Sequence, residues 1–275
     1  MESVHRSFSG SFPEFYDRYL VPFFFSPFAQ DIVGRLRVDP NAKVLELACG
    51  TGVVTQGIAS KLASAGSIIA TDLNTAMIDI ARKKLPEDPR ITWRQEDATD
   101  LSFGDGAFDA VVCQFGWMFF PDRARAAREA ARVLRLGGQL LFNTWDSLKE
   151  NRLPAEVYAG VRECFTTDPP TFYDVPFSMS DPAEHLRLAT EAGLNDVTVD
   201  RVNLVGARLN PRDAATGVIR GGPFVTEIEQ RGANADTVIE LVAGRLKRRF
   251  GAEPLAANLS ALVCSAKTAG DRKAD

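Results

Sequence analysis

A run of apolar residues that ends in a glycine-rich turn constrains this chain more than any other feature. Residues 44–52 read Val-Leu-Glu-Leu-Ala-Cys-Gly-Thr-Gly, in which one residue separates Gly50 from Gly52. Only a residue without Cβ lets the backbone turn this sharply and approach a ligand closely. We expect a helix from about Thr55, whose N-terminus would point free N–H groups and the positive end of its dipole at that ligand. The segment therefore predicts a site for a nucleotide-type cofactor.

The turn is not a complete dinucleotide-binding fingerprint. That fingerprint reads G-x-G-x-x-G after a strand, whereas this chain has Ala48-x-Gly50-x-Gly52 and lacks the third glycine. The turn indicates a cofactor without identifying it, and an NAD-dependent oxidoreductase remains an alternative at this point.

Apolar stretches alternate with helix-length stretches through the first half of the chain. We expect strands at residues 42–48, 67–72, 91–97, 108–115 and 139–145. Helices are expected at about 55–62, 74–85 and 122–134, with Gly137 and Gly138 forming a turn before the fifth strand. Strands that alternate with helices of this length predict an α/β fold with a parallel, doubly wound sheet.

The second half has a different pattern. A helix is expected from Asp181 to Gly193, strands at 196–206 and 259–266, and a further helical stretch at 236–250. Segments 146–180 and 210–253 leave the carboxyl ends of strands, where open α/β sheets bind ligands. We interpret both segments as substrate-cap insertions in one domain that spans residues 1–275, with irregular packing connectors as the alternative.

Composition narrows the class of protein. A net charge of −4 argues against a nucleic-acid-binding protein, which would need a basic face. The four cysteines form no C-x-x-C pair, so neither a metal site nor a disulfide scaffold is expected. The apolar stretch 20–29 is too short to span a bilayer. We therefore expect a cytoplasmic protein, a monomer or homodimer, that is not inserted in a membrane.

Two acids follow strands at positions suited to a nucleoside. Asp72 ends the second expected strand, where its carboxylate can accept both ribose hydroxyls. This spacing also fits NAD dehydrogenases. Asp97 ends the third expected strand, and with the backbone N–H of Ala98 it can recognise the amine and the neighbouring ring nitrogen of adenine.

These motifs, taken in order, resemble those of the class I S-adenosylmethionine (SAM)-dependent methyltransferases, in the ubiquinone-biosynthesis-like branch. The similarity runs from about Tyr16 to Trp145 and includes E-x-A-C-G-T-G at 46–52 and L-R-x-G-G-x-L-L at 134–141. Ala48 stands where the family often has glycine. The resemblance implies a seven-stranded sheet whose last strand enters antiparallel between the fifth and sixth, with SAM as cofactor and S-adenosylhomocysteine (SAH) as product.

The resemblance also implies which residues bind the cofactor. Residues 41–145 would form the SAM-binding core, with Met77 packed on adenine and the backbone of Gln114 or Phe115 at the methionine end of SAM. The cofactor-binding residues so implied are Tyr19, Glu46, Ala48, Gly50, Thr51, Gly52, Asp72, Leu73, Met77, Asp97, Ala98, Gln114 and Phe115.

Aromatic residues are concentrated between Phe8 and Phe28. The stretch resembles the family's N-terminal lid, placed here in residues 1–40, and aromatic faces also favour a sulfonium cation. Helical packing on the sheet is the alternative. An aromatic lid favours an apolar or aromatic methyl acceptor.

The two histidines, His5 and His185, are not expected to be catalytic. His5 lies near the N-terminus, and we place His185 on the surface of an outer helix. Should the acceptor be a hydroxyl, Tyr16, Tyr19 and His185 are the weak candidates for a general base.

The sequence thus predicts a SAM-dependent methyltransferase that acts on a small molecule by in-line displacement. The alternatives are a SAM-binding protein without transferase activity and an NAD-dependent oxidoreductase.

Overall fold

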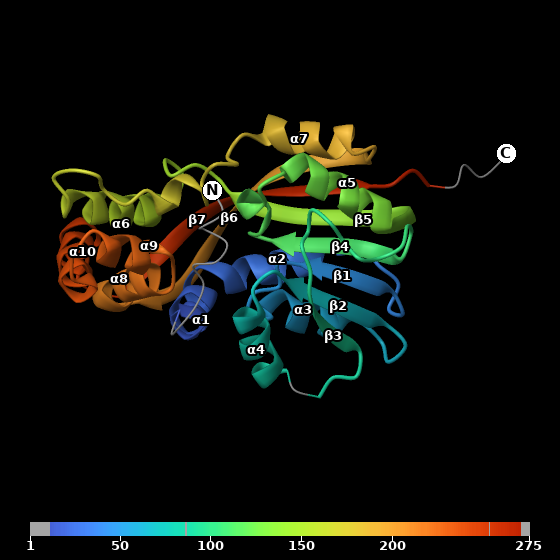
Figure 1. The fold of residues 1–275 in the computed structure, drawn as a ribbon, viewed down its shortest axis with the longest axis horizontal. Helices are drawn as coiled ribbons and strands as arrows, with labels where there is room; N and C mark the ends of the chain where they lie inside the picture. Colours follow the sequence, from blue (N-terminus) through green and yellow to red (C-terminus); the bar gives the residue numbers. More distant parts are fainter. Residues whose placement is uncertain (1–11, 86, 253, 271–275) are drawn as a thin grey trace. The chain divides into compact units, whose positions relative to one another are not determined.

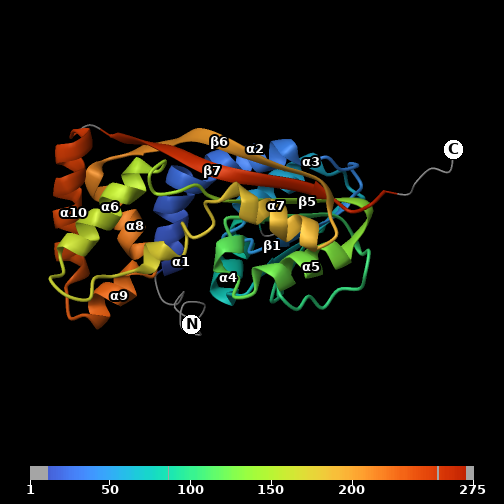
Figure 2. The ribbon, with the colours of Figure 1, turned by 90° about the horizontal axis from the view of Figure 1, so that it is seen from above.

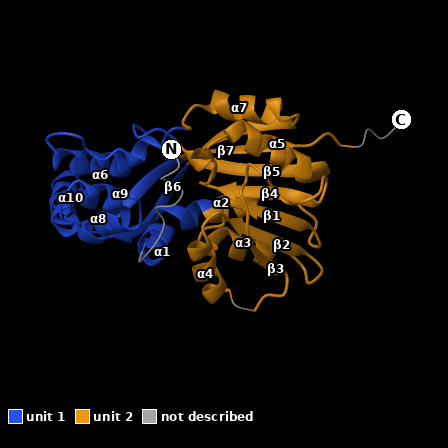
Figure 3. Cartoon of the chain, in the orientation of Figure 1, with its two compact units in different colours: residues 1–28, 146–178, 203–260 blue, residues 29–145, 179–202, 261–275 orange. Residues whose placement is uncertain are grey.

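The computed structural model describes residues 12–85, 87–252 and 254–270. His5 and Phe8 lie outside the described residues. The chain divides into two compact units (Figure 3). Unit 1 comprises residues 1–28, 146–178 and 203–260, and unit 2 comprises residues 29–145, 179–202 and 261–275. The two segments expected as caps thus contribute mainly to unit 1.

A seven-stranded sheet of order β3-β2-β1-β4-β5-β7-β6 forms the framework (Figure 1). Its strands are β1 (Lys43–Leu47), β2 (Ser67–Asp72), β3 (Ile91–Gln95), β4 (Phe108–Gln114), β5 (Leu134–Trp145), β6 (Asn195–Leu209) and β7 (Leu255–Lys267). The first five strands pair in parallel, whereas β7 pairs antiparallel with β5. Figure 2 shows β7 and β6 as neighbouring long strands. The predicted doubly wound sheet, with its last strand antiparallel between the fifth and sixth, is confirmed.

Helices follow the capping signals of the sequence. The helices of unit 2 are α2 (Ser26–Arg35), α3 (Val53–Lys61), α4 (Thr75–Lys84), η2 (Trp117–Phe119), α5 (Arg123–Val133) and α7 (Pro182–Glu191). The first three residues of α2 belong to unit 1. Asn74, Asp122 and Asp181 each cap a helix by accepting a backbone N–H. Gly193 has a φ of 83° just after α7, as expected of a helix-ending glycine.

The core of unit 2 lies on both faces of the sheet. On one face, Ile32 of α2 and Ile58 of α3 pack with Val44 and Leu141. Each such side chain, fully buried, contributes about 1.5–3 kcal/mol. Phe142 follows Leu141 in β5 and so points to the opposite face, where its ring stacks on Trp117 and on His185 of α7.

The prediction of a turn at Gly137-Gly138 before the fifth strand is wrong. Strand β5 already begins at Leu134, which pairs with Phe108, and the next paired residues are Ala110 and Gln139. The extra residues of β5 form a bulge, in which Gly137 adopts a φ of 72°. A glycine supplies this conformation without steric cost, so the chain continues as a strand.

Unit 1 is built from helices, the second half of β6 and the first half of β7. Its helices are α1 (Phe12–Phe15), η1 (Tyr16–Phe25), α6 (Arg152–Glu163), η3 (Phe172–Asp174), α8 (Pro211–Arg220), α9 (Phe224–Gln230) and α10 (Ala235–Phe250). Helix η1 has π-helical geometry around Pro22, and Ser26 N–H donates to Val21 O across five residues. The wider turn accommodates a proline that lacks an N–H.

Candidate functional site

The turn after β1 reverses the chain through residues with positive φ. Ala48, Gly50 and Gly52 have φ values of 52°, 53° and 83°. The left-handed conformation costs Ala48, which carries a Cβ, about 1–2 kcal/mol. Gly52 is the N-cap residue of α3 and has no side chain to cap it. The first N–H groups of α3 therefore receive no side-chain cap from Gly52, whereas the backbone N–H of Thr55 bonds to Glu46.

Asp72 joins this turn to the start of α4. Its Oδ2 accepts the backbone N–H of Gly50 at 2.9 Å, and its Oδ1 accepts that of Asn74 at 2.8 Å. Burial raises the pKa of this carboxyl, which the N–H groups of Asn74 and Gly50 partly offset. Each carboxylate oxygen has about two acceptor positions, so Asp72 retains capacity for two ribose hydroxyls. Leu73 beside it is 45% exposed and offers an apolar surface for a flat ring.

Glu46 lies beneath the same turn. It is buried, and its Oε2 accepts the hydroxyl of Thr55 of α3 at 2.6 Å. Burial raises the pKa of the Glu46 carboxyl to about 8, although the Thr55 hydroxyl opposes the shift. A cationic group placed next to Glu46 would stabilise the ionised form. The Glu46 carboxyl is therefore mainly protonated at neutral pH.

The residues expected around adenine lie after β2 and β3. Met77 is buried on α4, and Ala98 is buried after β3. Asp97 accepts the backbone N–H of Thr99 at 2.8 Å and its hydroxyl at 2.7 Å, and both bonds end on Oδ1. The turn that presents Asp97 is thereby fixed.

The turn after β4 meets the turn after β1. Gln114 ends β4, and Phe115 follows with a φ of 52° and its ring stacked on Trp145 at 3.8 Å. A Cβ added to Gly116 would lie 2.5 Å from the Cβ of Ala48. Two neighbouring parallel strands thus end in touching turns, each with a left-handed, non-glycine residue.

Replacing Gly116 with alanine is expected to lower the free energy of unfolding by about 1–3 kcal/mol, because the new methyl group would overlap Ala48 and the sulfur of Cys113. Urea denaturation measures this change. Gly104→Ala is the matched control, since a Cβ there would meet nothing within 4 Å. Adding Ala48→Gly to the Gly116→Ala variant should restore part of the loss. Equal stability of the two single variants would contradict the close approach of the turns.

The tyrosines proposed for the site belong to unit 1. Tyr16 stacks on Phe25 at 5.0 Å, and Tyr19 stacks on Phe15 at 6.1 Å. A Cβ on Gly217 of α8 would lie 2.6 Å from the Cβ of Tyr19, so this tyrosine is packed against α8. Other aromatic residues of the segment are buried, namely Phe12, Phe23, Phe24, Phe25 and Phe28. Much of the N-terminal aromatic segment therefore serves packing, while Phe15, Tyr16 and Tyr19 remain half-buried.

His185 is not on the surface, and that expectation is wrong. Its ring is fully buried, with Nε2 at 2.8 Å from Thr144 Oγ1 and Nδ1 at 3.0 Å from Asp181 O. The ring also stacks against Phe142. Helix α7 packs on the sheet, and the side of the helix that carries His185 faces β5 instead of solvent. Both ring nitrogens are engaged by the fold.

Burial lowers the pKa of His185. As pH falls below about 6.5, the unfolded chain takes up a proton that the folded state resists, so the free energy of unfolding falls by up to about 1.4 kcal/mol per pH unit. Replacing His185 with glutamine should therefore destabilise the protein less at pH 5 than at pH 7. Denaturation curves at both pH values measure the difference, and an equal effect at the two would contradict a buried, neutral ring.

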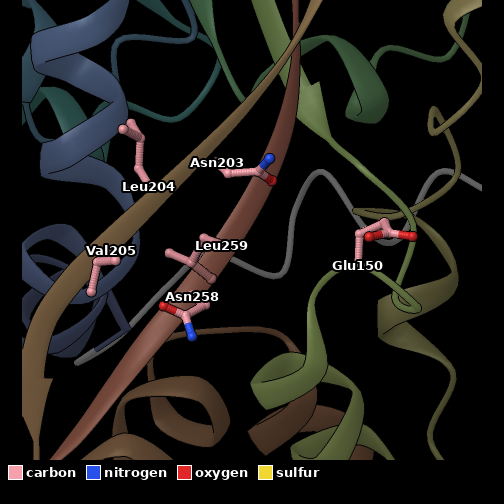
Figure 4. Close-up of a pocket in the computed structure, with 6 residues that line it drawn as sticks. All are labelled: Glu150, Asn203, Leu204, Val205, Asn258 and Leu259. Carbon is pink, nitrogen blue, oxygen red and sulfur yellow. The ribbon is translucent and has the colours of Figure 1, made fainter.

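Unit 1 contains a separate pocket of about 220 Å³ (Figure 4). Glu150, together with residues of β6 and β7, lines it: Asn203, Leu204, Val205, Asn258 and Leu259. Glu150 and the two asparagines are exposed. The lining includes none of the residues that the sequence assigned to the cofactor.

Among the described residues, no group of three or more acidic, histidine or cysteine side chains is arranged to hold a metal ion. None of the described helices is long and apolar enough to cross a membrane.

The comparisons with known proteins agree with this geometry. Residues 45–142 match the family model of a methyltransferase domain. Demethylmenaquinone methyltransferase of Lactiplantibacillus plantarum is 35% identical over 112 residues, which make up 40% of this chain and 47% of that relative. The chain thus spans about half the length of the curated relatives it matches.

Solved structures with the same fold differ in chemistry. A phosphoethanolamine N-methyltransferase of Haemonchus contortus, solved with phosphomonomethylethanolamine and SAH, has a TM-score of 0.62 at 16% identity and covers 97% of this chain and 61% of its own. The [4+2]-cyclase SpnF has a TM-score of 0.57 at 16% identity and covers 90% of this chain and 81% of its own. At such identities the likeness establishes the fold, and function is argued from the site.

Proposed function

We propose that this chain, whose residues 45–142 match the family model of a methyltransferase domain, is a class I SAM-dependent methyltransferase that transfers a methyl group from SAM to a small apolar or aromatic metabolite. The observation that carries the proposal is the bond between Asp72 and the backbone of Gly50. It joins the glycine turn to the carboxylate that would receive the ribose, at the carboxyl ends of adjacent strands. Open α/β sheets bind ligands at this edge.

The residues present fit SAM. Asp72 offers acceptors to the ribose hydroxyls, and Leu73 offers exposed apolar surface to adenine. Met77, the other residue assigned to adenine, is 6% exposed. Asp97 with Ala98 would recognise the adenine edge. The turn at Gly50–Gly52 brings backbone close to the ligand, and Glu46 provides a buried carboxyl that a cationic ligand would ionise.

Bound SAM supplies a methyl group that its positive sulfur has already activated. The protein therefore needs to align the acceptor with that group and to exclude water, and such positioning contributes at most about 7–11 kcal/mol. Since both nitrogens of His185 are engaged by the fold, Tyr16 and Tyr19 are the stronger of the proposed candidates for a general base. We expect replacement of either tyrosine with phenylalanine to slow transfer only to a hydroxyl acceptor.

Two observations support an apolar or aromatic acceptor. The relative from L. plantarum is named for a demethylmenaquinone. In unit 1, the aromatic residues Phe15, Tyr16 and Tyr19 are half-buried. The cytoplasmic location and the monomeric or homodimeric state remain predictions.

Transfer of tritium from methyl-labelled SAM to a panel of acceptors tests this proposal. We expect turnover with reduced naphthoquinones or catechols and none with phosphoethanolamine. The Asp72→Ala variant should lose this turnover, which controls for contaminating enzymes. Transfer to phosphoethanolamine alone would contradict the acceptor class. SAH binding without transfer to any acceptor would favour a SAM-binding protein, and NAD binding in place of SAH would favour the oxidoreductase.

A further inference from the structure

Asn143 is a fully buried polar residue in the apolar strand β5. It is the register partner of Gln114, the last residue of β4. The backbone N–H of Phe115 is shared between two acceptors of Asn143, the side-chain Oδ1 at 2.9 Å and the backbone O at 3.2 Å. Among the described residues, the buried Nδ2 of Asn143 has no hydrogen-bond partner. The oxygen of this buried amide is therefore paired within the fold, whereas its nitrogen is not.

The bond from Phe115 holds a strained residue. Phe115 has a φ of 52°, a left-handed conformation that side chains with a Cβ rarely adopt. Its ring stacks on Trp145 with an interplanar angle of 12°. Asn143 and Trp145 lie two residues apart on β5 and so share one face of the sheet. A single strand therefore fixes both the backbone and the ring of Phe115.

This turn lies where the sheet changes direction. From β1 the chain proceeds outward to β2 and β3, and from β4 it proceeds the other way to β5. Ligands of open α/β sheets occupy the crevice at such a switch point. Asp72 on β2 would hold the ribose on one side of β1. A substituent on the 5′ carbon of that ribose, if directed away from β3, would point toward the turns after β1 and β4.

We propose that Asn143 is a positioning residue, which fixes the left-handed Phe115 turn against the amino-acid end of the cofactor. This inference rests on the proposed function. It also deepens that function, because it assigns the two ends of the ligand to different strands. Asp72 serves the nucleoside, and Asn143, acting through Phe115, serves the 5′ substituent.

Calorimetric binding of two probes separates these roles. SAH carries the amino-acid end, whereas adenosine lacks it. We expect Asn143→Leu to weaken SAH binding at least tenfold and to change adenosine binding less than twofold. Asn143→Asp keeps an acceptor for Phe115 N–H and should recover most of the SAH affinity. Asn143→Ser removes the amide with a smaller change in shape and serves if the leucine variant does not fold.

Thr144→Val is the matched control. Thr144 is also buried in β5, but its hydroxyl bonds to Met179 O and His185 on the other face of the sheet. We expect this variant to bind both probes as the wild type does. Equal weakening of SAH and adenosine binding by Asn143→Leu would overturn the inference, because it would show a role in stability alone. Unchanged binding of both probes would also overturn it. A wild-type protein that binds neither probe would overturn the proposed function and this inference with it.

Discussion

Replacing Asp72 with alanine is expected to weaken SAH binding about 150-fold. The substitution removes the acceptor of two ribose hydroxyls, and hydrogen bonds to a charged group are worth about 1.5–3 kcal/mol each. A total loss of about 3 kcal/mol gives this factor. The change also frees Gly50 and Asn74, whose N–H groups the carboxylate now accepts. Isothermal titration calorimetry measures the affinity directly.

Two further variants isolate the cause. Asp72→Asn keeps one acceptor oxygen and should lie between the wild type and the alanine variant. Asp105→Ala removes an acid whose side chain is 82% exposed and should leave SAH binding unchanged. An Asp72→Ala protein that folds and binds SAH with wild-type affinity would show that the ribose is held elsewhere.

Replacing Glu46 with glutamine is expected to stabilise the protein increasingly as pH rises. The pKa of Glu46 is about 8 in the folded protein, against an ordinary value of 4.5. Between these values the folded state keeps a proton that the unfolded chain has lost, so the free energy of unfolding falls by about 1.4 kcal/mol per pH unit. The wild type therefore loses about 4 kcal/mol by pH 8, and the glutamine variant avoids this loss. The introduced glutamine side chain can still accept the Thr55 hydroxyl through its amide oxygen.

Urea denaturation at pH 5, 6, 7, 8 and 9 measures this difference. We expect the two proteins to differ little at pH 5 and the gap to stop widening above pH 8. Glu87→Gln, which makes the same substitution at an exposed acid of unit 2, is the matched control. A gap between Glu46→Gln and wild type that is independent of pH would mean that Glu46 is ionised in the folded protein.

Some features of this protein follow from the sequence because they depend on neighbours along the chain. The alternation of apolar strands and capped helices predicted the parallel sheet, and β2 begins and ends at the residues expected. The glycine turn and Asp72 were found in the same way, since strand ends of a parallel sheet share one edge. The antiparallel β7 followed from the family resemblance and from two late strands with no single short helix between them.

Other features depend on contacts between distant residues, which only the tertiary structure decides. His185 is buried because α7 packs its inner face on Phe142, far from it in the chain. A single asparagine within an apolar strand was the one signal of Asn143, whose partner Phe115 lies 28 residues away. The raised pKa of Glu46 arises from burial beneath the turn. Local sequence determines where strands and turns form, whereas the burial and partners of a polar side chain are fixed by the segments that fold over it.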